Sequence, residues 1–156
     1  MTRRSVLIAL LAFVLALPAL AIAQTPNFSG KWIQDMEKSD PPMGGRGPAG
    51  PQSLTITQTP ADITIERETP NGVMKTVYKL DGSESVNAMG RGGEVTSKSA
   101  WEGGKLVTKY SRTMGQTTVE VTETRSLEAD GTMTVVTVTK GGPQGDMTRK
   151  VVFKKA

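Results

Sequence analysis

Short alternating segments separated by turn residues fill the chain after Gln24, and no strong helical period appears there. Threonine and valine are frequent, while glycine, proline, asparagine and aspartate recur at short intervals, a pattern typical of strands joined by turns. Each segment has one polar face and one largely apolar face, as in an antiparallel meander. We expect strands at 28–35, 52–59, 62–69, 73–80, 94–102, 105–113, 116–128, 132–140 and 147–155, with a weaker one at 83–89.

Two-residue turns set the register of neighbouring strands, and register decides which side chains share a face. Four turn-forming dipeptides each bring large apolar residues opposite one another. At Asp130-Gly131 a two-residue turn and a longer bulged turn both fit. The four turns and the pairs that they predict are 60–61 with Ile56–Ile65, 71–72 with Ile65–Tyr78, 103–104 with Trp101–Leu106, and 114–115 with Tyr110–Val119.

A meander of this length exposes two sheet edges unless it closes on itself. An even number of up-and-down strands allows the first and last strands to pair antiparallel, which favours counting 83–89 as a strand. We therefore predict an all-β fold, an antiparallel up-and-down β-barrel of eight to ten strands.

The first residues have the three parts of a secretory signal peptide. Arg3 and Arg4 form a basic start, the apolar run at 6–17 is short for a membrane span, and Ala21-Ile22-Ala23 fits a small-x-small cleavage site. We expect a signal peptide at 1–23 and a single mature domain at 24–156. The paired arginines also fit a twin-arginine signal, so the export route stays open. The predicted location is periplasmic or extracellular, as a soluble bacterial protein.

Composition excludes several classes of site. The chain contains no histidine and no cysteine, so a Ser-His-Asp triad, a cysteine nucleophile and a His/Cys zinc site are impossible. The net charge of +4 falls to +2 once Arg3 and Arg4 leave with the signal peptide, and export also argues against a nucleic-acid partner. We predict no catalytic residues, no metal and no cofactor.

Gly30 and Trp32 lie on the first expected strand, where glycine permits close approach and tryptophan can plug a barrel end. Five short motifs lie along the mature chain: NFSGKWIQD at 27–35, EKSD at 37–40, LDG at 80–82, WEG at 101–103 and VFKK at 152–155. In these motifs the chain resembles the calycin superfamily of lipocalins and fatty-acid-binding proteins, above all secreted bacterial lipocalin-like proteins of unknown function. The resemblance implies a lipocalin-like barrel in which a cation, Arg149 or Lys154, packs over Trp32.

The chain also departs from fatty-acid-binding proteins. Those proteins place two helices after the first strand, where this chain has a Pro/Gly-rich segment at 36–53 that we expect to be a flexible loop. Such a loop acts either as a functional lid or as a solvated spacer. The Arg-x-Tyr pair that grips a fatty-acid carboxylate becomes Val151 and Phe153, so that site does not carry over.

A different set of basic residues faces the predicted lumen. The register points Arg67, Arg112 and Arg125 inward together with Glu123, and it puts Arg67 and Arg112 at the barrel end that carries the 36–53 loop. Guanidinium groups there would favour an anionic ligand through charge-assisted hydrogen bonds. Alternatively, the arginines reach out to water from the rim. The predicted ligand-binding residues are Arg67, Tyr78, Trp101, Tyr110, Arg112 and Arg125.

These features favour an exported, non-enzymatic barrel that binds an apolar or amphipathic small molecule, with a negative charge on the ligand as one option. The alternative is a packed barrel without a ligand, which would act as an interaction or accessory module in the cell envelope. An enzyme is the least favoured hypothesis, with Glu123 beside Arg125 as its one lumenal acid–base candidate. No membrane span and no particular oligomeric state are predicted.

Overall fold

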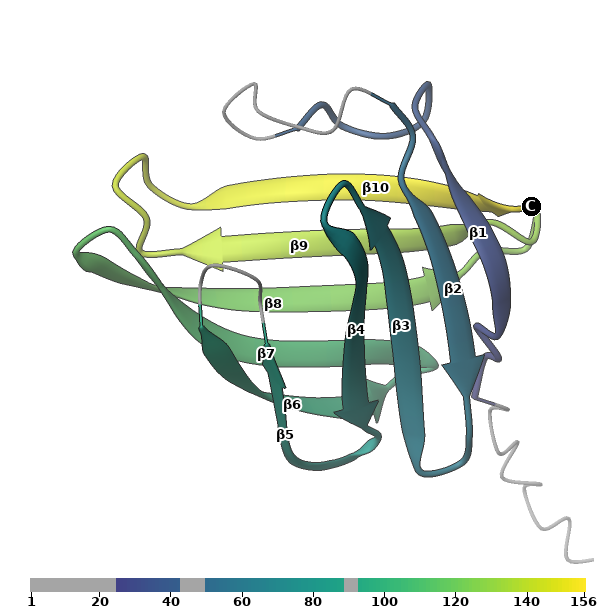
Figure 1. The fold of residues 1–156 in the computed structure, drawn as a ribbon, viewed down its shortest axis with the longest axis horizontal. Coiled ribbons are helices and arrows are strands. Elements are labelled where there is room, and N and C mark those ends of the chain that lie inside the picture. The colour runs from purple at the N-terminus through teal and green to yellow at the C-terminus, as the bar shows by residue number, and fades with distance from the viewer. Residues whose placement is uncertain (1–24, 43–49, 89–92) are drawn as a thin grey trace, which may run out of the picture.

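The computed structural model describes residues 25–42, 50–88 and 93–156, which form ten strands in one antiparallel sheet (Figure 1). The predicted signal peptide at 1–23 lies outside the described residues. Within the described ranges no helix is long and apolar enough to cross a membrane. The strands are β1 (Gly30–Asp35), β2 (Ser53–Gln58), β3 (Asp62–Thr69), β4 (Gly72–Lys79), β5 (Asp81–Ala88), β6 (Glu94–Glu102), β7 (Lys105–Met114), β8 (Thr117–Leu127), β9 (Met133–Lys140) and β10 (Met147–Lys155).

The strand order is β4-β3-β2-β1-β10-β9-β8-β7-β6-β5, so the first and last strands are neighbours in the middle of the sheet. They pair antiparallel, with Trp32 opposite Lys155 and Asp35 opposite Val152. In Figure 1 the strands β1–β4 run across β7–β10, and the sheet curls into a nearly closed barrel. The prediction of an all-β, up-and-down antiparallel barrel is confirmed. The weak strand expected at 83–89 is present as β5.

The register confirms two of the four predicted turns and corrects the other two. Ile56 lies opposite Ile65, and Trp101 lies opposite Leu106, as expected. Between β3 and β4, however, Ile65 lies opposite Thr76 and not opposite Tyr78. The two-residue turn is 70–71 rather than 71–72.

Local chemistry explains the shifted turn after β3. Pro70 occupies the second position of the turn and Gly72 the fourth, the places where type I turns favour these residue types. Thr69 also closes the turn, because its hydroxyl donates to the Gly72 carbonyl at 2.6 Å and accepts the Asn71 amide at 3.3 Å.

The turn between β7 and β8 is 115–116 rather than 114–115, so Tyr110 lies opposite Val121 and not opposite Val119. Gly115 has φ +66°, and the favoured two-residue hairpin turns need a positive φ at their first central position. Both corrected registers differ from the prediction by two residues. Because side chains alternate with a period of two, every residue on these strands keeps its predicted face.

The turn between β8 and β9 is the longer, bulged one of the two that fit the sequence. The Gly131 amide donates to the Glu128 carbonyl at 2.9 Å, and the Glu128 amide donates to the Thr132 carbonyl at 2.8 Å. Gly131 has φ +80°, the left-handed conformation that a three-residue hairpin turn needs at this place.

Side chains rather than a backbone ladder join β4 to β5, the two ends of the strand order. The Asn87 amide receives the Val77 N–H at 2.7 Å and donates to the Val77 carbonyl at 2.8 Å, as a neighbouring peptide group would. Ser85 accepts the Lys79 N–H at 2.8 Å. The barrel therefore closes at this seam through two polar side chains of β5.

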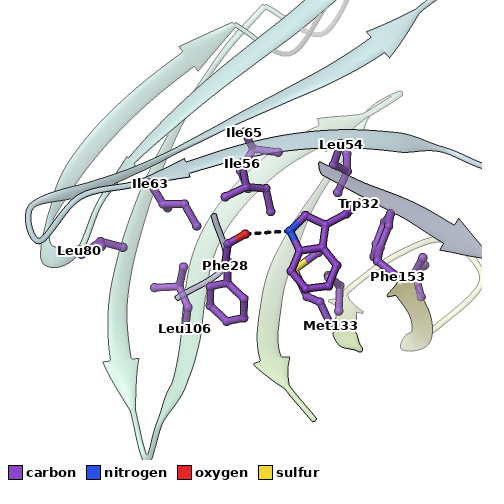
Figure 2. Close-up of a cluster of buried hydrophobic side chains, with 12 residues drawn as sticks. Phe28, Trp32, Leu54, Ile56, Ile63, Ile65, Leu80, Leu106, Met133 and Phe153 are labelled. Atoms are coloured by element: carbon purple, nitrogen blue, oxygen red, sulfur yellow. Dashed lines mark hydrogen bonds between the residues drawn. The ribbon is translucent and has the colours of Figure 1, made fainter. Parts of the chain in front are cut away.

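One half of the barrel interior is filled by a hydrophobic cluster (Figure 2). Trp32 and Phe28 are both fully buried, and the Trp32 indole N–H donates to the Phe28 carbonyl at 2.7 Å. The Phe28 ring stacks on Trp101 with ring centroids 5.9 Å apart. The segment before β1 thus enters the barrel end and plugs it. The other members of the cluster are Leu54, Ile56, Ile63, Ile65, Leu80, Leu106, Met133, Val135, Val151 and Phe153.

The cation over Trp32 is Lys155, whose Nζ lies 5.2 Å from the ring centroid, so the prediction of Arg149 or Lys154 is wrong. Lys154 lies opposite Ile33, so its side chain is on the opposite face of β10 from that of Lys155. Gly30 lies beside this lysine and has φ +130°, a backbone conformation that favours glycine. The ammonium group also donates to the Ser29 carbonyl at 3.2 Å.

Replacing Lys155 with Gln should lower the free energy of unfolding by about 1 kcal/mol, through loss of the cation–π contact. The matched control is Lys154→Gln, which removes the same charge one residue away and should change stability by less than about 0.5 kcal/mol. Urea titration of both variants measures the difference. Equal losses in the two variants would contradict the assignment.

Replacing Asn87 with Ala should destabilise the barrel by about 1–3 kcal/mol, since the Val77 N–H and carbonyl lose their partners. Hydrogen exchange at the Val77 amide should also become faster than in the parent protein. Asn71→Ala, at an exposed turn, is the control for the loss of an asparagine. Unchanged exchange at Val77 would show that the seam does not depend on this side chain.

Candidate functional site

A cavity of about 380 Å³ occupies the half of the barrel that the hydrophobic cluster leaves open. Its floor is the upper surface of that cluster, formed by Leu54, Ile65, Val135, Val151 and Phe153. Pro42 and Gln52, on the two flanks of the loop between β1 and β2, also line it. The hypothesis of a barrel filled by its own side chains therefore fits only the plugged half.

Five of the six residues predicted to face a ligand line this cavity: Arg67, Tyr78, Tyr110, Arg112 and Arg125. Glu123 lines it as well. Trp101 does not, because it lies beside the turn at 103–104 and stacks on Phe28 in the plugged half. The prediction that Trp101 faces the barrel interior is correct, but its predicted place beside the ligand is wrong.

The arginines differ in depth, from the interior to the mouth. Arg125 is 4% exposed, and its terminal nitrogen forms an ion pair with Glu123, two residues away on the same face of β8. Arg67 is half-buried and Arg112 is exposed at the rim. The Nε atoms of Arg67 and Arg125 are buried and have no hydrogen-bond partner among the described residues. Buried donors of this kind normally have a partner, so these two atoms cost free energy in the folded protein.

Arg149 also lines the cavity, although it was predicted to pack over Trp32. It lies opposite Thr137, and its Nε donates to the Pro41 carbonyl at 3.2 Å. The signal for this position was present in the sequence. Val151 and Phe153 face inward on β10, and counting back by two places Arg149 on the same face.

The beginning of the Pro/Gly-rich segment lies along β10 at the cavity mouth. The Asp40 amide donates to the Lys150 carbonyl at 2.8 Å, and the Lys150 amide donates to the Asp40 carboxylate at 2.6 Å. The Ser39 hydroxyl accepts the Val152 amide at 2.9 Å. These contacts hold residues 39–41 against the barrel and bring Pro42 to the cavity. Residues 43–49 lie outside the described part of the chain.

Two tyrosine hydroxyls face the cavity as neutral groups. Burial, together with the negative charge of Glu123, raises the pKa of Tyr110 to about 12, while Arg112 and Arg67 act in the opposite direction. Burial and Glu123 also raise the pKa of Tyr78. Both hydroxyls therefore stay protonated at neutral pH, where they can donate hydrogen bonds to a ligand.

Comparisons with known proteins agree with the fold. No protein-family model matches the sequence, and no curated protein matches it. Among solved structures, the fatty acid transporter REP1-NXSQ is similar with a TM-score of 0.62 and 16% identity, covering 82% of this chain and 95% of that chain. A variant of the fluorescent protein UnaG is similar with a TM-score of 0.58 and 20% identity, covering 83% of this chain and 96% of that chain.

A single-residue variant of the same transporter matches with a TM-score of 0.59 and 17% identity, over 82% of this chain and 97% of that chain. The chain thus shares its antiparallel β-barrel fold with these solved structures. At these identities the likeness concerns the fold. The residues of the cavity must be interpreted from this chain alone.

The two tyrosines are the only ones in the chain, so absorbance at 295 nm during a pH titration reports on them directly. In a Tyr78→Phe variant, the pKa of the remaining residue Tyr110 should stay well above the ordinary tyrosine value, because burial and Glu123 raise it. Between pH 10 and pH 12 the folded protein then holds a proton that the unfolded chain has lost, so stability should fall as pH rises through this range. A midpoint near the ordinary tyrosine pKa of about 10 would contradict burial of Tyr110.

Proposed function

We propose that this protein is an exported, non-enzymatic barrel that binds a small amphipathic, anionic molecule in the arginine-lined cavity. The observation that carries the proposal is the excess of guanidinium groups around the cavity: four arginines line it against one carboxylate among the described residues, that of Glu123. Ligand oxygens in the cavity would accept hydrogen bonds from these groups, and hydrogen bonds to a charged acceptor are the strong ones.

The size and lining of the cavity suit a small molecule. Ligand pockets measure roughly 300–1,000 Å³ and combine apolar walls with a few polar groups that orient the ligand. Here the apolar part is the floor at Leu54, Val151 and Phe153, while arginines and tyrosine hydroxyls supply the polar part. A structural neighbour named as a fatty acid transporter supports binding of an amphipathic molecule by this type of barrel.

Binding without catalysis is supported by what the cavity offers chemically. Glu123 is the one carboxylate among the described lining residues, and its ion pair with Arg125 occupies it. A chain without histidine or cysteine lacks the usual activators of a nucleophile. Export is proposed from the signal-peptide pattern at 1–23.

Native mass spectrometry of the processed protein tests the proposal. The full chain is expressed with its own signal, purified from the exported fraction without detergent, and compared with a sample that was denatured and refolded. We expect an extra mass on the exported sample alone. Identical bare masses would contradict a resident ligand and would favour the alternative of an interaction module in the cell envelope.

The double variant R67A/R112A should lose most of the extra mass while it keeps the parental circular dichroism spectrum and urea midpoint. Each arginine that pairs with an anion contributes about 1.5–3 kcal/mol, so loss of two weakens binding by roughly 100-fold or more. The matched control removes two exposed lysines of the outer wall, Lys75 and Lys98, and should keep the extra mass. An unchanged mass in R67A/R112A would exclude these two arginines from binding.

A further inference from the structure

We infer that the ligand is a compact molecule with two negative charges, and not a long-chain acid with one. The inference rests on the proposed function and names the ligand class for the same cavity. Three observations support it: the balance of charges inside the cavity, the distribution of the arginines around the barrel, and the limit that the hydrophobic cluster sets on length.

The lining of the cavity carries more positive than negative charge. Arg67, Arg112, Arg125 and Arg149 line it together with one carboxylate among the described residues, that of Glu123. Arg125 is buried and paired with Glu123, Arg67 and Arg149 are half-buried, and Arg112 is exposed at the rim. A monoanion would compensate only one of the two half-buried guanidinium groups, whereas a dianion compensates both, and an unpaired charge is costly where water is restricted.

The cations come from separate parts of the barrel wall. Arg67 lies on β3, Arg125 on β8 and Arg149 on β10, and four strands separate β3 from β8 in the strand order on either side of the barrel (Figure 1). Arg67 and Arg125 both lower the pKa of Tyr78, so their charges act on the same space. Anionic groups at one side of a ligand would meet only part of this set.

The arginines also differ in the partners that they already have. Arg125 forms an ion pair with Glu123 through a terminal nitrogen. Arg149 donates its Nε to the Pro41 carbonyl and also lines the cavity. Arg67 lines the cavity as well and has no carboxylate partner among the described ion pairs. Arg67 and Arg149 therefore each lack a carboxylate partner among the described residues, in keeping with two anionic groups on the ligand.

The plugged half of the barrel limits the length of the ligand. Trp32 and Phe28 fill the space below the floor with no exposed surface, and a hydrogen bond holds the indole in place (Figure 2). At about 380 Å³ the cavity is near the lower end of the range for ligand pockets. A long alkyl chain would have to displace this cluster or project through the mouth into water, whereas a short apolar body fits on the floor.

Isothermal titration calorimetry with four probes tests the inference. The probes are naphthalene-2,6-dicarboxylate, 2-naphthyl phosphate, 2-naphthoate and palmitate, so the first three share one apolar body and differ in charge. We expect at least one of the two dianions to bind about tenfold or more tightly than 2-naphthoate and palmitate. Which dianion binds better distinguishes a dicarboxylate from a phosphate ester.

Arg67→Gln should reduce the affinity for the preferred dianion about tenfold and bring it close to that of 2-naphthoate. Lys98→Gln removes one charge from the outer wall and is the matched control, expected to leave the dianion preference unchanged. If Arg67→Gln does not fold, Arg149→Gln serves the same test on β10. A dianion preference that survives loss of Arg67 and loss of Arg149 would overturn the inference.

The results separate failure of the inference from failure of the proposed function. Tighter binding of 2-naphthoate or palmitate would overturn the dianion and leave the binding barrel intact. No binding of any probe, together with a bare native mass, would overturn both. If no probe binds but an extra mass is present, the released molecule is titrated: two acidic groups support the inference, and one or none overturns it.

Discussion

Burial of Trp32 and Phe28 across one barrel end is the arrangement on which the rest of the structure depends. The indole N–H donates to the Phe28 carbonyl, so the polar atoms of the plug are satisfied, while stacking on Trp101 and contact with Met133 add apolar burial. Dense packing there leaves the remaining interior as a separate compartment with an apolar floor. The position of the plug thereby decides how deep a ligand can lie.

Barrel closure uses two different kinds of joint. β1 and β10 pair through a regular ladder next to the plug, where Lys155 lies over Trp32. β4 and β5 meet through the side chains of Asn87 and Ser85, which take the place of peptide groups. A side-chain seam removes the exposed edges of the sheet without a complete ladder. It also makes closure depend on individual residues.

The open compartment concentrates charge that a purely structural interior would not hold. Buried guanidinium groups cost free energy unless they are paired, and Glu123 compensates only one of the interior arginines. Tyr78 and Tyr110 stay neutral because burial and Glu123 raise their pKa values. The compartment is thus a set of donors with few acceptors, which is why a ligand rich in acceptors complements it.

The sequence by itself determined the strands, the single antiparallel meander and the face of each cavity residue. Arg67, Arg112 and Arg125 point inward as predicted even though two turns are displaced, because a shift of two residues preserves the alternation of faces. The position of each residue along the barrel axis could not be predicted from the sequence. Trp101 lies in the plugged half, Arg149 lines the cavity, and Lys155 lies over Trp32. The alternation of side chains along a strand predicts only whether a residue faces the interior or the solvent. The depth of a residue within the barrel follows from the long-range pairing of β1 with β10 and from the barrel end that the segment before β1 enters.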